Sequence, residues 1–184
     1  MISPASPPIK SAETIGLVQV LVRYGAIPQV ARYTIDPDQE VTVDRGTAVV
    51  ISTDRGRELG EVLEVVPAAY AASHESAGAI EHVATADDQA LHMQRQEQAA
   101  ASFESWSQRI RDWKLELELM DIEQTLDDEK HILYVLNDRG AETTRLALLA
   151  AAAGLGIVSV QPIAADGIVD GSGGGCGSGG GCSD

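Results

Sequence analysis

The sequence predicts a mixed α+β fold: a small SH3-like β-barrel, then a ferredoxin-like sandwich of the split βαββαβ kind, then a disordered glycine- and cysteine-rich tail. Three observations lead to this prediction. Short β-branched segments crowd the amino-terminal third of the chain, a long apolar stripe of helical period follows, and glycine dominates the last segment. We therefore divide the chain into a disordered leader (1–13), a barrel (14–67), a sandwich (79–164) and a flexible tail (165–184).

The barrel prediction rests on segments rich in β-branched residues, with glycine, proline and aspartate between them: 15–23, 29–35, 47–53 and 57–66. In the first segment Val18, Val20 and Val22 fall on one side of the strand, as in a half-buried strand. So many short strands in so little chain favour a small closed barrel.

A charged hairpin over residues 53–62 joins the third and fourth of these segments. Asp54, Arg55 and Gly56 supply its tight reversal, because glycine adopts a positive φ without a clash at Cβ. Gly60 interrupts the return strand, and an isolated glycine inside a strand marks a bulge or a close approach of another backbone.

The sandwich is predicted to begin with a short strand at 79–83, followed by a long helix. Thr85 is the expected N-cap, because the carboxylate of Asp88 follows three residues later as in a capping box. One face of the helix then collects apolar side chains at three- and four-residue steps: Leu91, Ala99, Phe103, Trp106, Ile110 and Trp113.

After the helix, leucine alternates with glutamate over residues 115–119, so the chain has changed to the period of a strand. A bulge near Met120 would return Ile122 to the buried face. The remaining elements are a strand, a helix and a strand: 131–136, 143–153 and 157–163. This order is that of the split βαββαβ arrangement, in which both helices cover one face of an antiparallel sheet. If 79–83 is not a strand, a three-stranded sheet under two helices remains.

The hairpin reads Thr53-x-Arg55-Gly56-x-Glu58-x-Gly60-x-Val62. It precedes a threonine-acid helix opening, a long amphipathic helix, an acidic leucine strand and a second strand that ends in Asn137-Asp138-Arg139-Gly140. In this order the elements resemble the polymerase-suppressor (PSP) C-terminal domain family, the RicT-like (YaaT-like) regulatory proteins of bacteria, over residues 15–163.

The resemblance implies a cytoplasmic, non-catalytic regulatory or adaptor subunit that acts on RNA processing through protein–protein contacts. Its implied partners are other proteins of a regulatory complex, including an endoribonuclease. The residues that it singles out for interaction lie in the hairpin motif: Arg55, Gly56, Arg57, Glu58 and Gly60.

The family tail carries glycines followed by Cys-Gly-Arg-x-x-Cys-Cys. Cys176 and Cys182 align with its first and last cysteines, whereas Ser178 and Gly181 replace its arginine and its other cysteine. A four-iron cluster takes four ligands, so the resemblance implies at most an iron–sulfur cluster shared with partner subunits. Two exposed thiols in a glycine-rich tail are the other interpretation, and the sequence leaves both open.

Charge restricts the classes of partner. The formal net charge of −15 repels nucleic acid and anionic lipid unless basic residues are segregated, so direct binding of nucleic acid is not expected. The alternative is a nucleic-acid-binding module in which Arg45, Arg55 and Arg57 of the barrel form a rim that contacts phosphates. Residues 146–153 carry no charge, which indicates core packing or, if the outer side of this helix is also apolar, a docking face for another protein.

No arrangement typical of an enzyme occurs in the sequence, and the function is predicted to be non-catalytic. The histidines share no metal-ligand spacing, and there is no nucleophile elbow, phosphate loop or dinucleotide fingerprint. The acidic cluster 127–129 lies in a predicted turn and is expected to be a solvated tip. With no apolar run of membrane-spanning length and no secretory signal at its start, the chain is predicted to be cytoplasmic.

Overall fold

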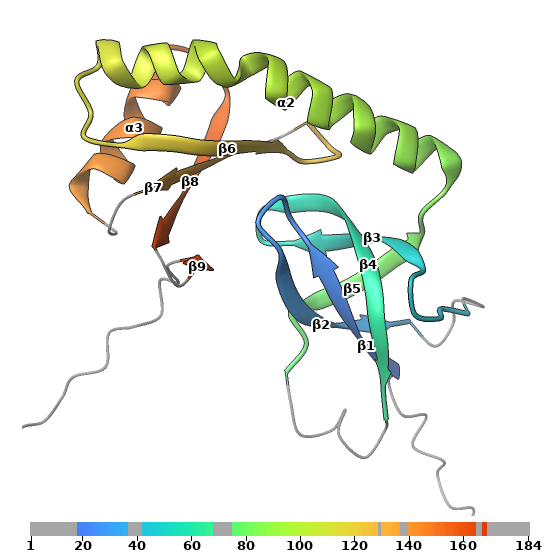
Figure 1. Ribbon diagram of the computed structural model, residues 1–184. Coiled ribbons are helices and arrows are strands. Elements are labelled where there is room, and N and C mark those ends of the chain that lie inside the picture. The colour runs from blue at the N-terminus through green and yellow to red at the C-terminus, as the bar shows by residue number, and fades with distance from the viewer. Residues whose placement is uncertain are drawn as a thin grey trace, which may run out of the picture.

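The computed structural model describes residues 18–36, 42–67, 75–128, 130–136, 140–164 and 167–168. The fold is mixed α+β, as predicted: a closed five-stranded barrel lies beside a separate sheet that carries two helices (Figure 1). The predicted leader and the two tail cysteines, Cys176 and Cys182, lie outside the described residues.

The barrel has the strand order β1-β2-β5-β3-β4 and closes where β1 pairs with β4. Its strands are β1 (Val18–Tyr24), β2 (Gln29–Ile35), β3 (Ala48–Thr53), β4 (Gly56–Val66) and β5 (Gly78–Val83). Small β-branched side chains fill the interior together with Tyr33, which is the largest buried residue there. The four strands predicted from the amino-terminal segments are all present.

The strand predicted at 79–83 forms, but its assignment to the sandwich is wrong. It is β5, which pairs in parallel with β2 and antiparallel with β3, and so closes the gap between their free edges. Ile80 is buried in the barrel core. The barrel therefore extends to Val83 rather than ending at residue 67, because an unpaired edge in a small barrel has to be covered.

The second sheet has the order β6-β7-β8-β9, and its elements follow one another along the chain. The helices and strands of this second part are α2 (Ala86–Asp112), β6 (Glu118–Gln124), β7 (Lys130–Leu136), α3 (Ala141–Ala152), β8 (Ile157–Ala164) and β9 (Gly167–Ile168). The predicted all-antiparallel sheet is wrong, since β8 runs parallel to β7. Helix α3 provides the crossover connection that two adjacent parallel strands require.

Both helices pack into one hydrophobic core with β6 and β7. On α2 the predicted apolar face is confirmed, with Ala99, Trp106 and Ile110 buried. The predicted bulge is also present: the register between β6 and β7 shifts between Leu119 and Asp121, and Ile122 is buried.

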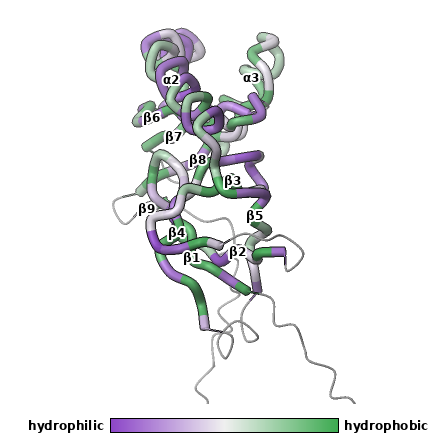
Figure 2. Tube along the Cα trace, turned by 90° about the vertical axis from the view of Figure 1, so that its right-hand side faces the viewer, coloured by the Kyte–Doolittle hydropathy of each residue, from purple (hydrophilic) through white to green (hydrophobic). Residues whose placement is uncertain are grey.

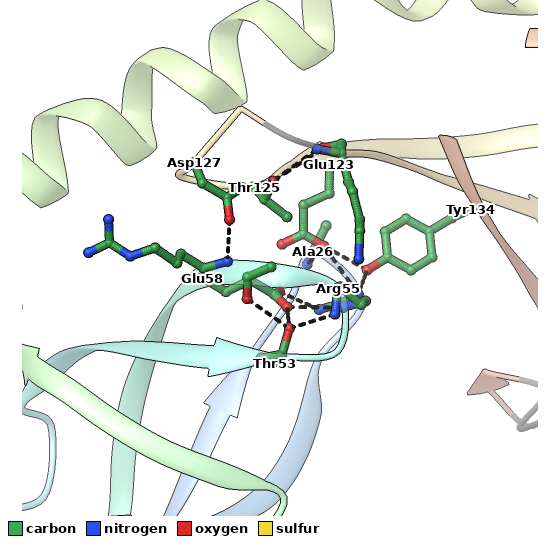
Figure 3. A network of polar contacts seen from close by, with 11 residues as sticks. Ala26, Thr53, Arg55, Glu58, Glu123, Thr125, Asp127 and Tyr134 are labelled. Carbon is green, nitrogen blue, oxygen red and sulfur yellow. Dashed lines mark hydrogen bonds and ion pairs between the residues drawn. The ribbon is translucent and has the colours of Figure 1, made fainter. Parts of the chain in front are cut away.

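The two faces of β7 have different environments. Leu133 and Val135 belong to the core under the helices, whereas Ile132 and Tyr134 alternate with them and face the opposite side of the sheet. That side is directed toward the barrel, and Tyr134 reaches the barrel hairpin there (Figure 3). The barrel core and the helix-covered core are thus separate clusters, joined through a polar contact.

Helix α2 begins at the predicted N-cap. The hydroxyl of Thr85 accepts a bond from the backbone N–H of Asp88 (3.2 Å) and donates one to its carboxylate (2.6 Å), while the backbone N–H of Thr85 donates to the same carboxylate (2.9 Å). These bonds lower the pKa of Asp88 to about 2.

Thr85→Ala is therefore expected to lower the free energy of unfolding by about 1 kcal/mol at pH 7. Because the pKa of Asp88 is depressed in the folded state, its contribution is present above the unfolded value of about 4 and is lost as the pH falls toward 2. Urea denaturation should show that the difference in the free energy of unfolding between the parent and Thr85→Ala is smaller at pH 3 than at pH 7. Thr85→Ser should behave like the parent. A deficit that does not depend on pH would contradict this account.

Candidate functional site

The predicted motif hairpin contacts the turn between β6 and β7 (Figures 1 and 3). The backbone N–H of Leu126 donates to the carbonyl of Arg57 (2.8 Å), and the N–H of Arg57 donates to the carboxylate of Asp127 (3.0 Å). The ammonium of Lys130 donates to the carbonyl of Asp54 (2.7 Å). We call this contact between the hairpin 53–58 and the β6–β7 hairpin the joint.

Arg55 lies at the centre of the joint and is only 7% exposed. Its guanidinium forms a two-pronged ion pair with Glu58, which is 3% exposed, and the Nε–Oε1 distance is 3.0 Å. The hydroxyl of Thr53 donates to the same carboxylate (2.6 Å). The remaining nitrogen, Nη1, donates to the hydroxyl of Tyr134 on β7 (2.7 Å), so that one side chain bridges the barrel and the sheet (Figure 3).

Glu123 on β6 completes the network. Its Oε2 accepts hydrogen bonds from the hydroxyl of Tyr134 (2.7 Å) and from the backbone N–H of Ala26 in the β1–β2 turn (3.1 Å), and lies 3.6 Å from Nη1 of Arg55. The ring of Tyr24 lies against the guanidinium, 5.4 Å from ring centroid to Cζ. Two turns of the barrel are thereby held to two strands of the sheet.

The surroundings of Arg55 and Tyr134 in the joint raise the pKa of both groups. Burial alone would lower the pKa of Arg55, but Glu58, Tyr134 and Glu123 together outweigh burial and raise the pKa, so the guanidinium stays charged. Burial and then the charge of Glu123 raise the pKa of Tyr134, which stays a hydroxyl. Arg55, Glu58 and Glu123 thus each have a partner of opposite charge or a hydrogen bond, and this network holds the barrel against the sheet.

The two motif glycines have the properties predicted for them. Gly56 has φ +134°, and a Cβ there would lie 3.0 Å from Oδ2 of Asp127 and 3.2 Å from Cγ2 of Thr125. Gly60 permits a close approach, because a Cβ there would overlap Cγ1 of Val22 on the neighbouring strand β1. Gly56 therefore belongs to the joint and Gly60 to the barrel wall.

Gly60→Ala is expected to lower the free energy of unfolding by about 1–3 kcal/mol through overpacking against Val22. Combining it with Val22→Ala should cost less than the sum of the two single changes, since the second change removes the overlapping methyl. Urea denaturation of the four proteins of this cycle measures the coupling. If the losses of the two single changes simply add in the double variant, the close approach of β1 to β4 is not the reason that position 60 requires glycine.

The arginines proposed for a phosphate-contacting rim do not share one surface role. Arg55 is buried and is therefore not available to phosphates. Arg57 is exposed, and its Nε donates to Glu81 on β5 (2.7 Å), while Arg45 is exposed in the turn before β3. Arg23 likewise pairs with Glu61 at 2.6 Å. Carboxylates thus compete with any phosphate for Arg57 and Arg23.

A cleft of about 360 Å³ lies beside the joint, between the barrel and the first half of α2. The pair Arg23–Glu61 lines it on the barrel side, and His92 and Glu123 line it on the other. Burial lowers the pKa of His92, which is therefore neutral at pH 7. Among the described residues, no three histidine, cysteine, aspartate or glutamate side chains come together in a way that could hold a metal ion.

A second feature lies on the outer side of α3. Leu148 is 66% exposed, and Ala151 and Ala152 are exposed on the same side of α3. Ile157, at the start of β8, is 60% exposed, but Val158 and Val160 pack against the helix-covered core, so Ile157 lies on the other face of the sheet. We call Leu148, Ala151 and Ala152 the outer α3 surface. Residues 146–164 contain no ionisable side chain, and the end of α3 is coloured hydrophobic in Figure 2 where α2 is largely hydrophilic.

The partners of the motif in the joint were not identified from the sequence. The sequence predicts only a strand for Tyr134 and a solvated tip for Asp127, and it does not single out Glu123, but all three hold the hairpin. The available signal was the tyrosine in the otherwise apolar run 132–136, because a polar end on a buried strand requires a partner.

Comparison of the chain with protein-family models, with curated proteins and with solved structures gives no match. The resemblance to the PSP C-terminal domain family therefore stays a prediction from the sequence. Of the helices in the described part of the chain, none has both the length and the apolar character needed to cross a bilayer.

Proposed function

We propose that this protein is a non-catalytic regulatory or adaptor subunit that acts through protein–protein contacts. In line with its resemblance to RicT-like proteins, we place it in a bacterial cytoplasmic complex that acts on RNA processing. The observation that carries the proposal is the outer α3 surface, on which Leu148 is 66% exposed beside two exposed alanines.

An exposed surface of this kind is unusual in so acidic a protein. The chain has a formal net charge of −15, yet residues 146–164 contribute none of it. Leu148 is on the outer side of α3, whereas Leu146 and Ala150 already fill the core, so Leu148 has no packing role within the described chain. Apolar surface free of charge is the composition found at the centre of protein–protein interfaces.

The joint supports an adaptor in a different way. Arg55 and Glu58 are committed to holding the barrel against the sheet, so the motif fixes the relative position of two surfaces instead of reacting with a ligand. A scaffold that presents surfaces in a fixed orientation lowers the entropic cost of binding its partners. The motif residues therefore serve interaction indirectly, through the rigidity of the chain.

Affinity purification from the source cells tests the proposal, with Leu148→Lys compared with Met93→Lys. Both residues are more than half exposed, and the two changes add the same charge on different helices. We expect the parent and Met93→Lys to recover the same proteins in constant ratio and Leu148→Lys to lose at least one. Recovery of RNA alone, weakened by salt as phosphate contacts are, would favour the nucleic-acid alternative.

A further inference from the structure

The outer edge of β8 is open along most of its length. On one side β7 pairs with β8 from Ile157 to Ile163. On the other side, within the described residues, β9 pairs only with Ile163 and Ala164. The backbone groups on the outer edge of 157–161 therefore have no strand partner in the described part of the chain.

This edge lacks most of the features that normally prevent strands from pairing. Residues 157–161 include three β-branched apolar side chains and no charge, and the register with β7 has no bulge. Only Pro162, which directly precedes the residues of β8 that pair with β9, limits the pairing of a further strand with this edge. Edge strands without charges, bulges or a cover accept a further strand readily.

A groove of about 470 Å³ runs beside the edge, between α3 and β8. Its walls are small or neutral: Gly140, Thr143, Thr144, Ala147, Val160 and Pro162. A strand added to an edge needs such space for every second side chain. Backbone groups and groove together define a site for an extended segment.

We propose that the edge of β8 at residues 157–161 binds an extended segment of a positively charged partner protein by β-strand addition. The chain itself already uses this mode at the end of the same edge, where β9 is seated on Ile163 and Ala164. We expect the partner to be basic because this protein has a formal net charge of −15, whereas residues 157–161 carry no charge. The apolar strand would make the contact, and the negative field of the protein would attract the positively charged residues on either side of the bound segment. A second copy of this protein would instead add another net charge of −15, and the repulsion between like charges would oppose its binding. The inference rests on the proposed adaptor function and specifies its partner.

The test selects linear dodecapeptides from a random library against the full chain and measures the affinity of the selected peptides. We expect the selected peptides to contain β-branched residues flanked by lysine or arginine. When such a peptide binds, hydrogen exchange of the backbone amides of residues 157–161 should become slower. N-methylation of alternate peptide bonds should weaken binding at least about tenfold, because strand addition depends on main-chain hydrogen bonds. Ile157→Lys should do the same, whereas Met93→Lys, which makes the same charge change elsewhere, should not.

Several results would overturn the inference. Selected peptides that bind elsewhere, that tolerate N-methylation or that are acidic would exclude strand addition by a basic segment. A dimer of the full chain that Ile157→Lys dissociates would make a second copy the occupant. Protection of the amides 157–161 in the free chain that disappears on truncation after Ile168 would assign the edge to residues 169–184.

The outcomes also separate this inference from the adaptor function. In one outcome, affinity purification recovers the same partners from the parent and from Ile157→Lys, and the selected peptides fail to displace them. In that case the adaptor function stands and strand addition fails. If the peptides bind the edge as expected but no protein is recovered from cells, the binding site stands and the adaptor function fails.

Discussion

Arg55→Met is expected to lower the free energy of unfolding by about 3–5 kcal/mol, the largest effect of any single change considered for this protein. The substitution keeps much of the side-chain volume but leaves the carboxylate of Glu58 buried without its cation. It also removes the hydrogen bond to Tyr134 that ties the barrel to the sheet. Urea denaturation at pH 7 measures the loss.

Two control variants identify the cause. Arg57→Met removes an exposed ion pair from the same hairpin and should cost no more than about 1 kcal/mol. The double change Arg55→Met with Glu58→Leu should recover much of the loss, because no uncompensated charge then remains. If Arg55→Met costs no more than Arg57→Met, the buried pair does not stabilise the joint.

The same variant should depend on pH in a definite direction. Burial raises the pKa of Glu58 even beside Arg55, and removal of the arginine raises it further. A carboxyl whose folded pKa lies above its unfolded value binds a proton more readily when folded, so its penalty falls as the pH falls. The deficit of Arg55→Met relative to the parent is therefore expected to be smaller at pH 5 than at pH 8.

Gly56→Val is the second large effect, with an expected loss of about 3 kcal/mol. A β-branched residue at φ +134° is strained by about 1–3 kcal/mol, and its Cβ would also lie 3.0 Å from the carboxylate of Asp127. The contact between the hairpin and the β6–β7 turn should open first. Amide exchange at Arg57 and Leu126, whose N–H groups bond across the joint, is expected to accelerate before that of the barrel core.

Gly46→Val provides the matched control. Gly46 also has a positive φ, +86°, but a Cβ there meets nothing within 4 Å. This variant should show backbone strain alone, with a smaller loss of stability and no change in exchange at Arg57 or Leu126. Equal losses for the two variants would mean that the contact with Asp127 adds nothing.

Local patterns in the sequence were sufficient for many elements. The alternation around Val20 and Val22, the capping residues Thr85 and Asp88, and the spacing of Ala99, Trp106 and Ile110 all predicted what is observed. Each of these signals depends on residues within one or two turns or strand repeats, where backbone geometry alone decides which side chains share a face. The bulge before Ile122 could be predicted for the same reason.

The partner of β5 could not be predicted in this way. The pattern around Ile80 shows a strand with a buried side, which is equally compatible with the barrel and with the sandwich. The choice depends on the free edges of β2 and β3, which are distant in sequence and meet only in the closed barrel. Pairing of strands is decided by which edges remain open once the other strands have paired.

The sequence by itself determined the strands of the barrel, the apolar face and cap of the long helix, and the need for glycine at two positions of the motif hairpin, because these depend on local backbone geometry and side-chain period. Only the tertiary structure decided that Arg55 is a buried link, since its partner Tyr134 is 79 residues away in the chain. The i,i+3 spacing of Arg55 and Glu58 is the same for an exposed pair and a buried one. Which of the two it becomes depends on the surface that folds over it, and that surface comes from another part of the chain.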